Sequence, residues 1–183
     1  MMLMDHLSAP EKKSVKKPHF FTLFLLMSFA SVAAVSYTPA LPAITRFFHI
    51  TEGTAQLTLT LYLLGFALGQ LCYGPIANRF GRKPTLYAGL VLAIVSSILC
   101  ASAGAFHAFG MLVVFRITQA LGTAVGMVMS FTIAADYYQQ RVARVHALLV
   151  LSLGVMSPLS AILGGFLVQH INWESCFYFL AIY

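Results

Sequence analysis

The chain has 183 residues, of which 60% are apolar and only 9% charged, and its formal net charge is +6. A soluble domain carries about 25% charged residues, so this composition excludes a disordered chain, a nucleic-acid-binding arm and an ordinary water-soluble fold. Four lysines gather in residues 12–17, which favours an anionic membrane surface over DNA. We therefore expect an integral membrane protein with a lipid bilayer, and no nucleic acid, as its partner.

Uncharged runs predict where the chain crosses the bilayer, because a helix needs about 20 apolar residues to span about 30 Å of hydrocarbon. The runs do not alternate polar and apolar residues, so they favour α-helices over a β-barrel. The lysine-rich start also fits a secretory signal, but the further spans favour a polytopic protein. We expect an all-α helix bundle with a cytoplasmic segment at 1–19, a transmembrane bundle at 20–183, and spans near 20–42, 54–77, 84–104, 110–134, 145–168 and, incomplete, 175–183.

Positive charges predict the orientation of this bundle. With a cytoplasmic N-terminus, nine Lys and Arg residues of segments 12–17, 79–83 and 141–144 lie inside, whereas Arg46 lies outside. This bias follows the positive-inside rule.

Prolines interrupt two of the expected spans. Pro39 and Pro42 lie near the outer end of the first span, and Pro158 lies within the fifth. Proline breaks the hydrogen-bond ladder of a helix, which gives either a fixed bend or a gating point.

Small residues recur at helix-packing spacing. Close approach of helix backbones explains them without any further function. The steps are Gly65 and Gly69 in the second span, Gly122 and Gly126 in the fourth, and Ala161 and Gly165 in the fifth.

The segment Gly74-Pro75-Ile76-Ala77-Asn78-Arg79-Phe80-Gly81-Arg82-Lys83 links the second and third spans. Its glycines permit a tight turn, and its cations hold it at the inner surface. The segment is either a topology-fixing loop or a moving part. Asp136, near the inner end of the fourth span, could pair with Arg82, a contact worth about 0–1 kcal/mol when exposed.

Arg116 is the most informative single residue, because it lies about six residues inside the fourth span. A guanidinium there costs about 2.5 kcal/mol or more unless it meets water or polar partners. It either forms a substrate or proton-coupling site facing a wet interior, or snorkels to the interface, or ties to nearby carbonyls. Gln119 lies one helical turn further on and could share its face.

Enzyme chemistry has no basis in the sequence, which lacks a nucleophile–base arrangement, a phosphate loop and a metal-ligand cluster. Cys72, Cys100 and Cys176 stand singly in apolar runs and are interpreted as packing residues. We expect no enzymatic activity and no metal.

Four stretches together resemble the major facilitator superfamily, specifically its drug:proton antiporters of the Bcr/CflA type. Segment 74–83 is similar to the signature between helices two and three, and the stretch from Arg116 to Gly122 resembles the helix-four signature. The segment from Tyr37 to Pro42 resembles the end of helix one in this subfamily, and that from Leu63 to Gln70 resembles its helix two. The likeness extends from about residue 20 to the last residue.

The resemblance implies the N-terminal six-helix half of a multidrug transporter in the bacterial inner membrane. Its expected function is chloramphenicol- or bicyclomycin-like efflux by proton antiport, with a small lipophilic drug or metabolite as substrate and the proton gradient, rather than a cofactor, as energy source. Arg116, Gln119 and Tyr37 would then serve substrate binding or proton coupling. The conformational switch would comprise Gly74, Asn78, Arg79, Gly81, Arg82, Lys83 and Asp136.

Three departures accompany this resemblance. Asn78 stands where the family loop has an aspartate, and Val35 and Ser36 stand where drug:proton relatives often carry an acid. The helix-five signature is only partly met by the stretch that ends in Gly164 and Gly165.

The length leaves alternatives open, because twelve spans of about 20 residues need about 240 membrane residues. Two copies could assemble, a second chain could supply the missing half, or the product could be a non-transporting truncated remnant. A metabolite carrier of the same superfamily is a further alternative.

Overall fold

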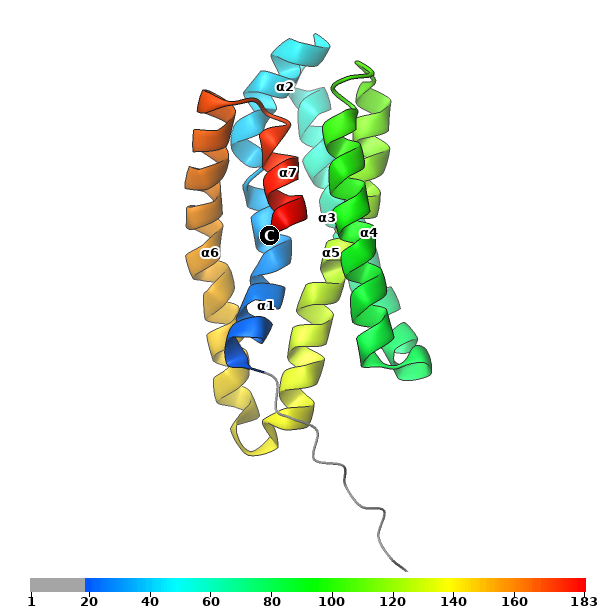
Figure 1. Cartoon of the computed structure of the whole chain (residues 1–183), viewed down its shortest axis with the longest axis vertical. Coiled ribbons are helices and arrows are strands. Elements are labelled where there is room, and N and C mark those ends of the chain that lie inside the picture. The colour runs from blue at the N-terminus through cyan, green and yellow to red at the C-terminus, as the bar shows by residue number, and fades with distance from the viewer. Residues whose placement is uncertain (1–18) are drawn as a thin grey trace, which may run out of the picture.

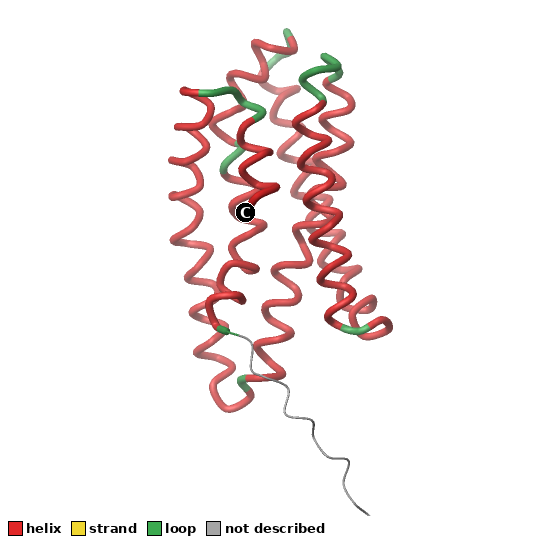
Figure 2. The backbone as a smooth tube through the Cα atoms, in the orientation of Figure 1, coloured by secondary structure: helices red, strands yellow, loops and turns green. Residues whose placement is uncertain are grey.

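The computed structural model describes residues 19–183, and that range contains helices and loops without strands (Figure 2). The expected all-α fold is confirmed. The lysine patch and the rest of residues 1–18 lie outside the described range. The elements are α1 Phe20–Val35, η1 Thr38–Ala40, α2 Leu41–Phe48, α3 Glu52–Phe80, α4 Arg82–Ser102, α5 Phe109–Tyr137, η2 Gln139–Arg141, α6 Val142–His170 and α7 Ser175–Ile182.

Five helical segments of the described chain are long and apolar enough to cross a membrane. They lie over the five predicted spans, and α7 begins where the sixth was expected. Their outer faces remain apolar: Leu71 on α3 is 74% exposed and Ile162 on α6 is 69% exposed. Side chains of this kind are solvated by lipid in a bundle of membrane helices.

The first candidate span, Phe20–Phe48, is not one continuous α-helix. The α-helix ends at Val35, a turn at Ser36 and Tyr37 follows, and the short helices η1 and α2 complete the crossing. Pro39 and Pro42 lack the N–H groups that would continue the ladder, which explains the break. Pro158 does not have this effect, because α6 continues through it.

The segment at 74–83 is less of a loop than its glycines suggest. Helix α3 runs through Gly74 and Pro75 to Phe80, and Gly81 alone separates it from α4. Gly81 has a φ of 93°, a conformation that only glycine adopts without strain. The expected tight turn therefore rests on this one glycine.

Helix α5 lies against α1, α3 and α4, and small residues bring these helices together. A Cβ added to Gly69 of α3 would lie 2.7 Å from Cβ of Ala124, and one added to Gly122 would lie 2.5 Å from the backbone nitrogen of Ala93 on α4. Gly65 is similarly close to the Ile117 carbonyl, and Gly126 meets the Leu26 carbonyl of α1. The glycines of the GxxxG steps in α3 and α5 therefore lie at close approaches between helices.

In the fifth span, small residues were predicted at Ala161 and Gly165, but the close backbone approach is at the neighbouring Gly164. Gly164 of α6, rather than Gly165, lies against the carbonyl of Ser36 in the turn after α1. Gly165 has only an ordinary contact at 3.9 Å with Pro39. The close approach at Gly164 holds the α1–η1 turn against α6.

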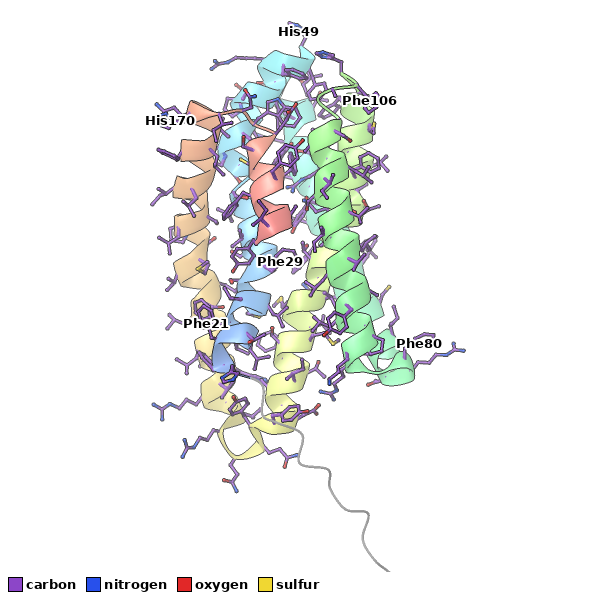
Figure 3. All side chains as sticks on the ribbon, in the orientation of Figure 1. Phe21, Phe29, His49, Phe80, Phe106 and His170 are labelled. Carbon is purple, nitrogen blue, oxygen red and sulfur yellow. The ribbon has the colours of Figure 1, made fainter. Side chains whose placement is uncertain are left out.

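One end of the bundle carries the start of α1 and the connections from α3 to α4 and from α5 to α6 (Figure 1). Phe80 lies at this end, whereas His49, Phe106 and His170 lie at the opposite end (Figure 3). The arginines near the two connections therefore share one end. That this end faces the cytoplasm stays a prediction.

Candidate functional site

Arg116 of α5 is completely buried inside the bundle. Its guanidinium carbon lies 4.0 Å from the ring centroid of Tyr37, 4.3 Å from that of Tyr62 and 5.7 Å from that of Phe177. These rings come from the turn after α1, from α3 and from α7, so three separate parts of the chain enclose one cation. Each aromatic face attracts the cation, by about 2 kcal/mol when both are desolvated.

A polar chain continues from the guanidinium across three helices. Nη1 of Arg116 donates to the carbonyl of Ala33 on α1 at 3.3 Å and to Oε1 of Gln119 at 2.7 Å. Gln119 in turn donates from Nε2 to Oγ of Ser97 on α4 at 2.7 Å. The contacts fix the amide orientation of Gln119 and tie α1, α4 and α5 together at the level of Arg116.

The two tyrosines are held by threonine hydroxyls. The Tyr37 hydroxyl lies 2.8 Å from Oγ1 of Thr58, which donates to the Ala55 carbonyl at 2.6 Å. Because Thr58 has one proton, Tyr37 donates to it. The Tyr62 hydroxyl lies 2.9 Å from Oγ1 of Thr123, and it also donates to the carbonyl of Ala30 on α1 at 3.3 Å. Both rings are therefore fixed beside the cation.

The charge of Arg116 has no acidic partner in the described chain. The described acids lie at helix ends: Glu52 begins α3, Asp136 lies near the end of α5, and Glu174 precedes α7. Nε and Nη2 of Arg116 are buried and have no hydrogen-bond partner among the described residues. Each such unmet donor lowers the stability of the fold by about 1–3 kcal/mol. A purely structural role therefore explains the cluster poorly, and we treat it as a candidate functional site.

The structure brings together Arg116, Gln119 and Tyr37, the three residues assigned from the sequence to substrate binding or proton coupling. It does not place Arg116 at the interface by snorkelling. Arg116 donates to the carbonyl of Ala33, and the surrounding residues bury its side chain completely.

Sequence reasoning missed Tyr62, Phe177 and Ser97. Tyr62 gave a usable signal, since a tyrosine inside an apolar span needs a partner for its hydroxyl. Phe177 gave none, because a phenylalanine in such a run is ordinary.

The set of residues assigned to the switch divides into two groups. Arg82 and Asp136 form an ion pair, and Nη1 of Arg82 also donates to the Thr132 carbonyl at 2.8 Å. The pairing expected from the sequence is present. Asn78, Arg79 and Lys83 are exposed instead, with the Arg79 guanidinium 5.4 Å from the ring centroid of Phe80.

These features define the class of protein: a multi-pass membrane protein whose helices enclose one buried cation. Residues 22–183 match the sequence profile of the Major Facilitator Superfamily, and the chain belongs to that family. Its members are transporters rather than enzymes, so the expectation that the chain is not an enzyme is confirmed.

Over the aligned segments, the chain is between 24% and 33% identical to three curated relatives. It is 33% identical over 162 residues to multidrug resistance protein D of Escherichia coli (strain K12), covering 87% of this chain and 40% of that protein. It is 31% identical over 166 residues to a chloramphenicol resistance protein of Pseudomonas aeruginosa, covering 88% and 39%. A bicyclomycin resistance protein homolog of Haemophilus influenzae is 24% identical over 162 residues, covering 88% and 40%. The chain thus spans about two fifths of the length of these relatives.

Proposed function

We propose that the chain forms the N-terminal half of a multidrug efflux transporter that exchanges small lipophilic drugs for protons across the bacterial inner membrane, with its N-terminus in the cytoplasm. The relatives named for multidrug, chloramphenicol and bicyclomycin resistance support this function. The observation that carries it is Arg116, a cation buried among aromatic rings with two nitrogens left unpaired.

Arg116, Gln119 and Tyr37 would form this half's contribution to the binding and coupling site. Binding of a substrate or transfer of a proton would change the charge around Arg116. This change would weaken or strengthen the contacts that Arg116 makes with residues of α1, α3 and α5 and, through Gln119, with α4. Movement of the turn that carries Tyr37 would transmit this change, since Ser36 and Tyr37 lie between the end of α1 and the start of η1.

Drug accumulation in a bacterium lacking its own efflux pumps tests this function. Alternating access by rocking needs two halves, so the complete natural gene product and the 183-residue chain are expressed in parallel. We expect the complete product to lower chloramphenicol accumulation and Arg116→Ala to abolish the effect. Equal accumulation in cells with wild-type protein and with empty vector would contradict efflux.

A second candidate is an assembly partner without transport of its own. It is favoured by Asn78, which stands where the family loop has an aspartate and so removes a charge from the switch segment. Co-purification of a second membrane chain with the tagged protein, together with efflux only in the presence of both chains, would support this candidate.

A further inference from the structure

We propose that the free edge of the Arg116 guanidinium binds the carboxylate of a lipophilic organic anion. The inference rests on the proposed function, in which Arg116 belongs to the substrate site, and names the charge class of substrate that this half of the site selects.

The pattern of unpaired atoms carries this inference. Nη1 of Arg116 makes both hydrogen bonds, to Ala33 and to Gln119, while Nε and Nη2 have no partner in the described chain. Nε and Nη2 share one edge of the guanidinium and present two parallel N–H groups. A carboxylate fits this edge, because its two oxygens accept both hydrogen bonds at once.

The walls around this edge suit an apolar body behind the carboxylate. Three rings, those of Tyr37, Tyr62 and Phe177, lie within 5.7 Å of the guanidinium carbon. The hydroxyls of Tyr37 and Tyr62 are engaged by hydrogen bonds to Thr58, Thr123 and the Ala30 carbonyl, so the surroundings of the guanidinium are mainly aromatic carbon. A ligand that reaches this edge would therefore meet aromatic surroundings, which suit an aliphatic or aromatic body.

The net charge of the cluster disfavours a positively charged ligand. The described acids lie at the ends of helices rather than beside Arg116, so the cluster carries an uncompensated positive charge. In a medium of low dielectric constant this charge repels a lipophilic cation and attracts an anion. The expected order of affinity is carboxylate, then neutral amide, then ammonium.

Entry of a ligand requires one wall to move. The ring of Phe177 is the furthest of the three, and it lies on the short helix α7. Its centroid is 6.1 Å from that of Trp173, which is the single tryptophan of the chain. Trp173 fluorescence therefore reports displacement of Phe177.

The test titrates the detergent-solubilised chain with three non-absorbing probes of the same body: cyclohexylacetate, cyclohexylacetamide and cyclohexylethylammonium. We expect saturable quenching or a shift of Trp173 emission, with cyclohexylacetate binding about tenfold more tightly than the amide. Arg116→Lys keeps the charge but loses the two parallel N–H groups, so it should reduce the carboxylate affinity about tenfold and the amide affinity by less. The matched control Arg46→Lys, at the outer end of the bundle, should change neither.

Equal affinity for the three probes, or a carboxylate affinity unchanged by Arg116→Lys, would overturn the inference. If Arg116→Lys does not fold, isotope-edited NMR of the wild-type chain decides instead. Cyclohexylacetate, and not the amide, must shift a buried arginine Nε–H resonance, and the absence of any shift overturns the inference. Arg116-dependent drug efflux without carboxylate preference would refute this inference alone, whereas carboxylate binding without efflux would refute the proposed function alone.

Discussion

The guanidinium of Arg116 lies 4.0 Å from the ring centroid of Tyr37, and this ring approaches it from the turn that interrupts the first membrane span. The turn exists because Pro39 and Pro42 follow it, and it is held by the close approach of Gly164 to Ser36. The break after α1 thus places the Tyr37 ring over the guanidinium of Arg116, which lies on α5. The predictions below follow from this cluster and from the packing that supports it.

Replacing Tyr37 tests the contact between ring and cation. We expect Tyr37→Leu to lower the free energy of unfolding by about 2–4 kcal/mol, because it removes both an aromatic side chain and the cation–π contact. Tyr37→Phe keeps the ring and loses only the bond to Thr58, so it should cost about 1 kcal/mol. Thermal unfolding in detergent, followed by circular dichroism, measures both. An equal loss for the two variants would show that the hydroxyl, rather than the ring, matters.

Removing the charge of Arg116 separates its structural role from its functional one. Replacing a buried, incompletely paired ion by an apolar side chain of similar size is often neutral or stabilising by about 1–4 kcal/mol. We therefore expect Arg116→Met to unfold at the same or a higher temperature while losing drug efflux. A large fall in stability together with normal efflux would make Arg116 a structural residue.

Gln119 should behave differently from Arg116. Gln119→Leu deprives Nη1 of its 2.7 Å acceptor and leaves the arginine charge in place. We expect a loss of about 1–3 kcal/mol in the free energy of unfolding. The matched variant Ser97→Ala removes only the next link of the polar chain, and it should cost less in the same unfolding measurement. A larger loss for Ser97→Ala than for Gln119→Leu would contradict the arrangement in which Gln119 links Arg116 to Ser97.

Gly122→Ala tests the packing between α4 and α5. The added Cβ would lie 2.5 Å from a backbone nitrogen, which the structure relieves only by separating the two helices. We expect a loss of about 1–3 kcal/mol, as for other overpacked interiors. Gly154→Ala on α6 is the matched control, because an added Cβ there meets nothing within 4 Å. Comparable losses for the two alanines would argue against close packing at Gly122.

Labelling of single cysteines tests the orientation of the bundle. Chains with Cys72 replaced by serine and a cysteine introduced at His49 or at Gln140 are treated in whole cells with a membrane-impermeant maleimide. The positive-inside rule predicts labelling at position 49 and protection at position 140 until the cells are opened. The reverse pattern would place the N-terminus outside.

The sequence by itself determined the all-α fold and singled out Arg116 as a charge within an apolar span. Its apolar runs are long and uncharged, and in lipid such runs can satisfy their backbone groups only as helices. The pairing of Gln119 with Arg116 was also predictable, because residues three apart on a helix share a face.

The tertiary structure alone decided what surrounds Arg116. Tyr37, Tyr62 and Phe177 reach it from three separate elements, and no periodicity within one helix encodes which rings meet in space. The interruption after Val35 and the choice of Gly164 over Gly165 likewise depend on how α6 meets the turn. Local patterns fix helices through hydrogen bonds within the chain, whereas the environment of a buried charge is fixed by packing between helices.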